Sequence, residues 1–200
     1  LIGKTSEPTR SELYEEAYRK IEKALSQDND EIMHVALHAG RLLPTPLVTK
    51  LVMKGLVDPS LRLQSLASGL ISFAEEEKRT EFVQKGLEQP EVAVQINAVN
   101  AIRDVPLAER KALLMRATRD DMPNEVKDAS VLAIQWLEEQ DRLFFIEQLL
   151  KGETRTLRLN GIYAIEFAPI HERARLIQMM LQDADERVRS SAVSVIYKAS

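Results

Sequence analysis

The segment Leu181-Gln-Asp-Ala-Asp-Glu-Arg-Val-Arg-Ser-Ser-Ala-Val-Ser-Val-Ile-Tyr197 decides the fold, because its pattern recurs five more times toward the N-terminus. Acidic residues mark a turn, and Val188, Ala192 and Ile196 then fall on one face of a helix. A small residue fixes the register. We call its position the small column: Ala36, Ala67, Ala98, Ser130, Gly161 and Ala192, spaced by 31 residues except for one step of 32.

Other columns keep the same register. Four residues before the small column stand Ile32, Leu63, Val94, Val126, Leu157 and Val188, and four after it stand Gly40, Ile71, Ile102, Ile134, Ile165 and Ile196. A first helix is indicated by the column fifteen residues before it, with Ile21, Val52, Val83, Met115, Ile146 and Ile177. Two helical patterns in phase predict six helix pairs. Within these pairs we expect Ala67, Ala98 and Gly161 at close helix contacts.

The repeat pattern sets the predicted domain boundaries. Residues 1–10 carry no apolar period and are predicted to be an arm or linker. Residues 11–200 form the repeat domain, with Ser11 as a candidate cap of the first helix. Prolines at the ends of successive pairs separate them, namely Pro44, Pro106 and Pro169. We expect the domain to be part of a longer protein.

Composition excludes several classes of protein. Of 200 residues, 44% are hydrophobic and 29% charged, as in soluble globular chains, and no apolar run approaches the roughly 18 residues of a membrane helix. The absence of cysteine excludes disulfides and thiolate metal sites. A net charge of −4 argues against a nucleic-acid partner, since phosphate binding needs clustered cations. We expect a cytoplasmic protein that does not insert into membranes.

The residues from Asp183 to Ala192 read D-x-x-x-x-V-R-x-x-A, and Asp58 to Ala67 match this in part. The unit resembles the HEAT repeat, and in particular the short repeats of phycobilisome lyase-like proteins. The resemblance implies an all-α solenoid in which pairs stack and second helices line the concave side. The position of the motif's arginine is basic only in the last three units, at Lys127, Arg158 and Arg189.

Candidates for chemistry are few. His34 and His38 are four residues apart, with Glu31 one turn earlier, a spacing that can bind a divalent metal. The one remaining histidine is His171, so we interpret these as surface histidines and predict no metal site. No nucleophile triad, phosphate-binding glycine loop or carboxylate pair is recognisable, and no catalytic residue or cofactor is predicted.

One stripe of the second helices favours a binding function. Positions two before, two after and five after the small column face away from the core, yet in the last four units they include large apolar residues. The predicted partner-binding residues are Ile96, Asn100, Arg103, Leu132, Gln135, Leu159, Tyr163, Glu166 and Tyr197. The alternative is that neighbouring second helices cover some of them.

These observations favour a non-enzymatic scaffold or adaptor that binds a protein or peptide segment along its concave second-helix surface. The alternative is a HEAT-like enzyme or enzyme accessory, similar to phycobilin lyases or to alkylpurine DNA glycosylases. A DNA enzyme requires a basic stripe. On this stripe Arg41 and Arg103 are offset by Asp128 and Glu166.

Overall fold

The computed structural model of the protein describes residues 9–25, 29–119 and 121–199. Within these residues it contains twelve α-helices and four short 3-10 helices, and no strand. The α-helices are α1 (Arg10–Leu25), α2 (Asp30–Gly40), α3 (Thr45–Gly55), α4 (Leu61–Ser68), α5 (Glu76–Leu87), α6 (Val92–Ala101), α7 (Leu107–Ala117), α8 (Asn124–Ala133), α9 (Glu139–Leu150), α10 (Arg155–Ala164), α11 (Ile170–Met180) and α12 (Glu186–Ala199). The all-α fold predicted from the repeat is confirmed. The predicted arm, apart from residues 9 and 10, lies outside the described residues.

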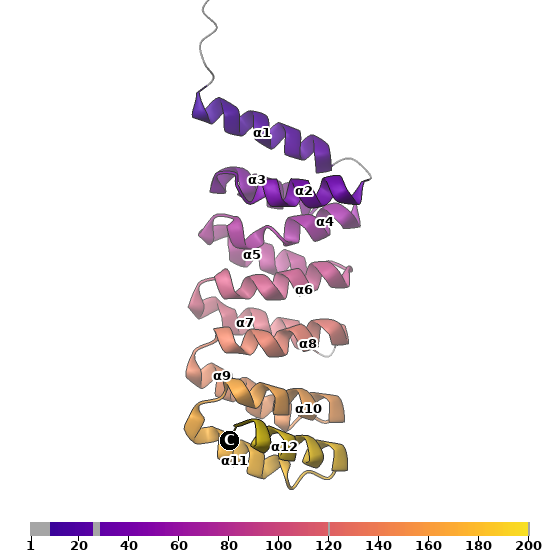
Figure 1. The fold of residues 1–200 in the computed structure, drawn as a ribbon, viewed down its shortest axis with the longest axis vertical. Coiled ribbons are helices and arrows are strands. Elements are labelled where there is room, and N and C mark those ends of the chain that lie inside the picture. The colour runs from indigo at the N-terminus through magenta and orange to yellow at the C-terminus, as the bar shows by residue number, and fades with distance from the viewer. Residues whose placement is uncertain (1–8, 26–28, 120, 200) are drawn as a thin grey trace, which may run out of the picture. The chain divides into compact units, whose positions relative to one another are not determined.

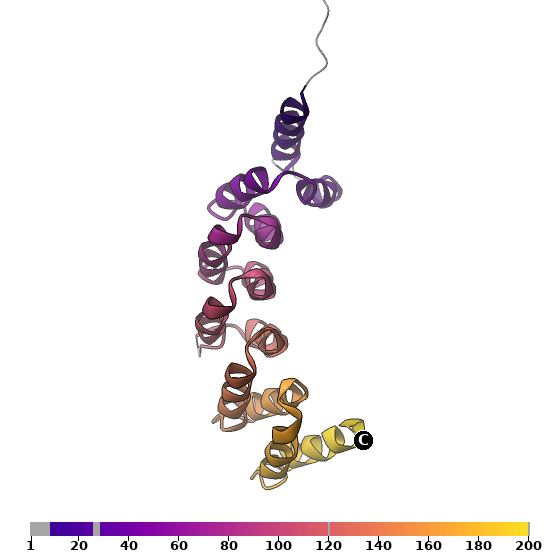
Figure 2. The ribbon, with the colours of Figure 1, turned by 90° about the vertical axis from the view of Figure 1, so that its left-hand side faces the viewer.

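The chain divides into two compact units, Leu1–Val105 and Pro106–Ser200. In the first unit α1 packs on α2, α3 on α4 and α5 on α6, and in the second unit α7 packs on α8, α9 on α10 and α11 on α12 (Figure 1). Second helices also contact each other, α4 with α6 in the first unit and α8 with α10 and α10 with α12 in the second. Each unit therefore has a layer of second helices beside its first helices (Figure 2).

Short polar caps and prolines start the helices. Thr9 and Glu12 form a reciprocal cap of α1, because the Glu12 amide donates to Thr9 Oγ1 (3.3 Å) and the Thr9 amide donates to Glu12 Oε2 (2.6 Å). The cap is therefore Thr9 and not Ser11, which the sequence suggested. Ser60 and Thr154 cap α4 and α10 with the hydroxyl alone, which accepts a hydrogen bond from the amide three residues later. Prolines precede α3, α7, α8 and α11, where no amide donor is needed.

Four second helices end in a 3-10 turn that the sequence pattern did not predict. These turns are η1 (Ile71–Phe73), η2 (Ile102–Asp104), η3 (Ile134–Trp136) and η4 (Ile165–Phe167). Each begins with the isoleucine four residues after the small column, and each of these side chains is fully buried. The carbonyls at the end of each second helix accept hydrogen bonds from arginines early in the first helices. Examples are Arg79 to Ala74 O and Asp104 O (2.9 and 3.0 Å) and Arg110 to Trp136 O (2.8 Å).

The small column lies at the closest helix contacts, as predicted. A Cβ added to Gly55 would lie 2.6 Å from the Ala67 Cβ, and one added to Gly86 would lie 2.8 Å from the Ala98 Cβ. A Cβ added to Gly161 would lie 2.8 Å from the backbone nitrogen of Leu150. Larger side chains at these positions would push the paired helices apart.

The one irregular repeat step places a predicted core residue wrongly. Met115 was assigned to the buried column of the first helices, but it is half exposed, whereas its neighbour Leu114 is fully buried. The extra residue of this repeat lies in the segment between α7 and α8, after the first helix. Counting back from the second helix therefore misplaces the first helix by one residue, which turns its face by about 100°.

Candidate partner-binding surface

The second helices of the second unit expose two large apolar side chains in equivalent positions. Leu132 of α8 is 57% exposed and Tyr163 of α10 is 61% exposed. The two helices pack against each other, and the Asn160 side-chain amide donates to Asp128 Oδ1 at 2.8 Å, which ties α10 to α8. Both residues stand two positions after the small column. They therefore belong to one surface, and both are exposed as predicted.

A pocket of about 280 Å³ lies beside Tyr163. Its lining comes from α10, η4, α11 and α12: Ile162, Tyr163, Ile165, Glu166, Arg173, Ile177 and Val195. Ile162 and Ile165 are fully buried and form an apolar floor. The phenol of Tyr163, the carboxylate of Glu166 and the guanidinium of Arg173 add polar groups. An apolar cavity with a few polar groups is typical of a binding site.

Arg173 fixes one wall of this pocket. Its Nε donates to Ala168 O at 2.9 Å and its Nη2 donates to Glu166 O at 2.6 Å. These bonds join the start of α11 to η4 and to the residue that follows η4, so the pocket is built on held backbone. The guanidinium and the Glu166 side chain line the same cavity, which gives it groups of both charges.

The other predicted binding residues of the second unit differ from one another in exposure. Gln135 is exposed in η3, where its amide donates to Leu132 O at 2.8 Å. Leu159 is half-buried in α10. The side chain of Tyr197 lies outside the described residues. The structure therefore brings Tyr163 and Glu166 together in the pocket and leaves Gln135 bonded within its own turn.

The first unit holds the other predicted residues. Ile96 is half-buried in α6, whereas Asn100 on the same helix is exposed. Arg103 is exposed in η2, and its Nε lies 3.1 Å from Asp104 Oδ2 in an ion pair. Of the eight predicted partner-binding residues whose side chains are described, six are exposed, and Ile96 and Leu159 are half-buried.

The second unit has another pocket, of about 240 Å³, which is lined mainly from the first helices α7 and α9 and also by Leu157 of α10. It is lined by Met115, Thr118, Phe144, Phe145, Gln148, Leu149 and Leu157. Lys111 lies over the Phe144 ring, with its Nζ 4.9 Å from the ring centroid, and forms an ion pair with Asp141 at 2.7 Å. No carboxylate or guanidinium lines this cavity, so it offers mainly apolar contact.

The basic column noted in the sequence closes turns. Arg189 donates to Asp183 O at 2.7 Å, and Arg158 donates to Gly152 O at 3.0 Å, six residues earlier in each case. In the first unit Gln64 makes the equivalent bond to Asp58 O at 2.8 Å. Because glutamine and arginine serve the same turn, this column needs a side-chain donor rather than a positive charge.

Arg158 has a further role in the second unit. Its Nε and Nη2 donate to the two carboxylate oxygens of Asp183, at 2.8 and 3.3 Å. Asp183 is nearly buried and lies in the turn of the following pair. This bidentate pair therefore links two neighbouring repeats, and it takes Arg158 out of any solvent-facing stripe.

The structure also bears on metals and membranes within its described residues. There, no three histidine, aspartate or glutamate side chains gather in the manner of a metal site, and the side chain of His34 is not among those described. Across residues 9–25, 29–119 and 121–199, none of the helices is both long and apolar enough to cross a bilayer.

Comparison with known proteins identifies the fold. No family model matches the chain, and no curated protein matches its sequence. The chain is similar to YibA of Escherichia coli, with a TM-score of 0.61 at 15% identity over 96% of this chain and 75% of that one. A designed armadillo repeat protein in complex with the peptide (KR)4 aligns at a TM-score of 0.47, with 18% identity over 98% of this chain and 96% of that one. The match to YibA and the paired helices of the described residues show the all-α repeat-solenoid fold that the repeat pattern predicts.

Five of the seven residues that line the pocket were not among the predicted binding residues. Ile165 and Ile177 belong to columns that were predicted to be buried, Ile162 and Val195 lie outside the predicted binding stripe, and Arg173 lies on a first helix, where no binding residue was predicted. A signal for Arg173 does exist. Arginines recur in the same place of four successive first helices, at Arg79, Arg110, Arg142 and Arg173. This recurrence predicts an arginine that donates hydrogen bonds for a structural reason. The pocket lies where Arg173 binds the backbone carbonyls of the turn after α10.

Proposed function

We propose that this chain is a non-enzymatic scaffold that binds a protein partner through the second-helix surface of its second unit. We define this surface by Leu132, Tyr163 and the pocket that Tyr163 shares with Glu166. The single observation that carries the proposal is the exposure of two large apolar side chains on adjacent helices, one of which, Tyr163, lines an apolar cavity with polar walls. Exposed apolar patches rimmed by polar groups are typical of interaction sites.

The chemistry of this surface indicates what the partner presents. Leu132 and Tyr163 offer apolar area, and the pocket floor suits a branched or aromatic side chain. The acidic groups nearby are Glu166 in the pocket wall and Asp128 one turn before Leu132. We therefore propose a protein segment that places an apolar anchor in the pocket and a basic or amide side chain against Glu166.

The pocket on the first helices is the competing location. It is lined by Met115 and Phe144, both partly exposed, and its polar lining groups are a hydroxyl and an amide. The second-helix pocket offers a phenol, a carboxylate and a guanidinium for hydrogen bonding. Directional groups of this kind give a partner orientation as well as affinity, which supports the second-helix surface.

Several more specific expectations drawn from the sequence also stay proposals. They include the contributions of Ile96, Asn100 and Arg103 from the first unit, a cytoplasmic location, and kinship with the short repeats of phycobilisome lyase-like proteins. They also include the absence of nucleic-acid binding. A titration with labelled duplex DNA at low salt tests this last point, since binding that weakens steeply with added salt would support the enzyme alternative.

The direct test compares matched aromatic substitutions on the two faces. The tagged chain is used to capture partners from its native source, together with the Tyr163→Ala and Phe144→Ala variants, and captured proteins are quantified by mass spectrometry. We expect the specific partner to be depleted by Tyr163→Ala and retained by Phe144→Ala, because both residues are exposed aromatics but only Tyr163 lies on the proposed surface. The reverse pattern would move the site to the first helices.

A further inference from the structure

One column near the end of the first helices is leucine in every repeat except the fourth. Eleven residues before the small column, the other repeats have Leu25, Leu56, Leu87, Leu150 and Leu181. In the fourth repeat this count falls on Arg119. The extra loop residue shifts α7 by one position, however, because Leu114 is buried there in place of Met115. The corresponding residue of α7 is therefore Thr118, which directly follows the helix.

The threonine leaves open a space beside α7. Leu56, Leu87 and Leu150 are at most 3% exposed, while Leu181 of the last pair is 36% exposed. Thr118 is half-buried and lines the pocket of about 240 Å³. A threonine side chain ends one bond nearer to the backbone than a leucine side chain does, so it reaches less far toward α9. We call this cavity the α7–α9 pocket.

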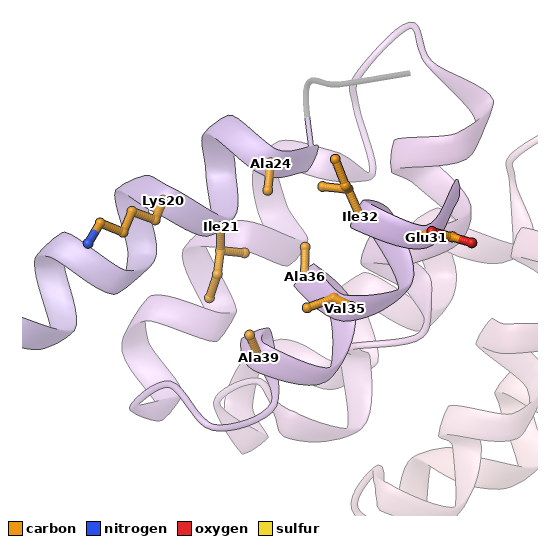
Figure 3. A pocket seen from close by; sticks show the side chains of 8 residues that line it. All are labelled: Lys20, Ile21, Ala24, Glu31, Ile32, Val35, Ala36 and Ala39. Atoms are coloured by element: carbon orange, nitrogen blue, oxygen red, sulfur yellow. The ribbon is translucent and has the colours of Figure 1, made fainter. Parts of the chain in front are cut away.

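A larger pocket, of about 420 Å³, lies between α1 and α2 (Figure 3). It is lined by Lys20, Ile21, Ala24, Glu31, Ile32, Val35, Ala36 and Ala39. It belongs to the first helix pair, whose outer face a preceding repeat of a longer chain would cover, so its exposure does not indicate a ligand. The α7–α9 pocket differs, because residues of two successive pairs of the second unit line it. Its opening does not depend on where the sequence begins or ends.

The aromatic wall of the α7–α9 pocket is held in place by its neighbours. The rings of Phe144 and Phe145 meet edge to face, with centroids 5.7 Å apart and an angle of 87° between the planes. Lys111 Nζ lies 4.9 Å from the Phe144 centroid and forms an ion pair with Asp141 at 2.7 Å. A ligand therefore meets a preformed wall, and binding avoids most of the entropy cost of ordering these side chains.

The polar groups of the pocket favour an uncharged ligand that carries a hydrogen-bond donor. Thr118 Oγ1 shares its one hydrogen between Leu114 O, at 3.0 Å, and Met115 O, at 3.2 Å. The oxygen can therefore only accept a hydrogen bond from a ligand. The other polar side chain of the lining is the amide of Gln148, and none of the seven lining residues is charged. A charged ligand would lose water here without gaining an opposite charge.

The volume of the pocket sets the size of the ligand. An apolar cavity of about 150 Å³ can bind benzene. The α7–α9 pocket has about 240 Å³, and Met115 and Phe144 in its lining are 50% and 41% exposed, so it is open to solvent. We propose that this pocket binds a small uncharged molecule with one aromatic ring and one hydroxyl group. The ring packs against the two phenylalanines, and the hydroxyl donates to Thr118 Oγ1.

This site is separate from the proposed partner-binding surface. It uses neither Leu132 nor Tyr163, and its lining shares no residue with the pocket beside Tyr163. It assigns a different class of ligand, a small molecule rather than a protein segment. The two proposals therefore stand or fall independently.

The first experiment maps the binding of phenol, toluene and benzoate through the amide chemical shifts of the chain in heteronuclear NMR spectra. We expect saturable shifts from phenol and toluene, confined to the end of α7, the second half of α9 and the start of α10. Benzoate should bind at least about ten-fold more weakly than phenol, because its carboxylate gains no partner. Shifts centred on Tyr163, or shifts that do not saturate, would overturn the proposal.

The second experiment changes Thr118 in two ways. Thr118→Leu restores the leucine of the other repeats, so it should raise the melting temperature and weaken both phenol and toluene at least about ten-fold by filling the pocket. Thr118→Val keeps the shape but removes the acceptor, so it should weaken phenol about two- to ten-fold and leave toluene unchanged. A lower melting temperature of Thr118→Leu would contradict the open space, and equal effects of Thr118→Val on both probes would contradict the hydrogen bond.

Control variants keep the two sites apart. Thr80→Val, at a half-buried threonine of α5, should leave phenol binding unchanged. Phe144→Ala should weaken phenol binding while retaining the captured protein partner, and Tyr163→Ala should do the reverse. Loss of the captured protein from Thr118→Leu would assign the α7–α9 pocket to a protein segment and overturn the proposal.

Discussion

The second helices of the two units are alike on the side that faces the core and different on the side that faces away. On the core side, Ile71 in the first unit and Ile165 in the second are both fully buried at the same register position. On the outward side, two positions after the small column, the first unit has His38, Gly69 and Asn100, and the second has Leu132, Tyr163 and Ser194. The fold thus depends on columns that both units share, and recognition depends on a column in which they differ.

The largest expected effect is on the free energy of unfolding, and it compares the two sides of α6. Ala98→Leu should lower the free energy of unfolding by about 1–3 kcal/mol, because its methyl already sits against the helix of Gly86. Asn100→Leu places the same side chain on the outward side of α6 and should change stability by less than about 0.5 kcal/mol. Urea unfolding followed by circular dichroism measures both. Equal losses from the two variants would show that the register assigns the core side wrongly.

The next largest expected effect is on partner binding, and it compares variants of the two units. Leu132→Asp and Tyr163→Ala should each weaken partner binding by about 2 kcal/mol if they are central anchors. Ser72→Asp, on the corresponding stripe of the first unit, should have a smaller effect. Titration calorimetry with the captured partner measures the difference. Normal binding by the second-unit variants would remove the distinction between the units, and unfolding would show that these residues belong to the core.

A smaller effect on stability tests the turn-closing column, which includes Gln64 and Gln95 in the first unit and Arg158 and Arg189 in the second. Arg158→Gln should keep a turn bond like that of Gln64 but lose the pair with Asp183, at a cost of about 1–2 kcal/mol. Adding Asp183→Asn should recover part of this loss, since no unpaired carboxylate then remains. Thermal unfolding of the two single variants and the double variant completes the cycle, and strict additivity would argue against the pair.

The smallest effect concerns an ion pair between α9 and α11. The hydrogen bond from Arg175 holds the pKa of Glu147 below its ordinary value of 4.5. A lowered pKa means that the folded state gains stability above that value and loses it as the pH falls below it. The side chains are 27% and 52% exposed, so Glu147→Gln should cost less than about 1 kcal/mol at neutral pH. Unfolding at neutral pH and near pH 3 measures this, and a pH-independent difference would contradict the assignment.

The repeat register made most of the fold predictable. Residues such as Ala98 and Ile165 recur because packed helices tolerate one size at each place, and a repeated constraint is visible in a single sequence. The 3-10 turns were missed because η1–η4 continue the helical period for one further turn. Met115 was misplaced because a loop insertion shifts one helix against its partner without changing either helical pattern.

The candidate site was predictable only in part. The exposure of Leu132 and Tyr163 follows from helix geometry, because a residue opposite the core faces solvent unless a neighbour covers it. The pocket does not follow from one helix, since its walls come from α10, η4, α11 and α12. Arg173 reaches it through hydrogen bonds to backbone carbonyls, which depend on how a turn meets a helix. Such contacts between elements leave no period in the sequence.

The most direct measurement of the central claim is amide hydrogen exchange of the chain with and without its captured partner. We expect slowed exchange on binding to concentrate in peptides covering α8, α10 and η4, with little change in α7 and α9. Protection confined to α7 and α9, around Met115 and Phe144, would contradict it and place the partner on the first helices.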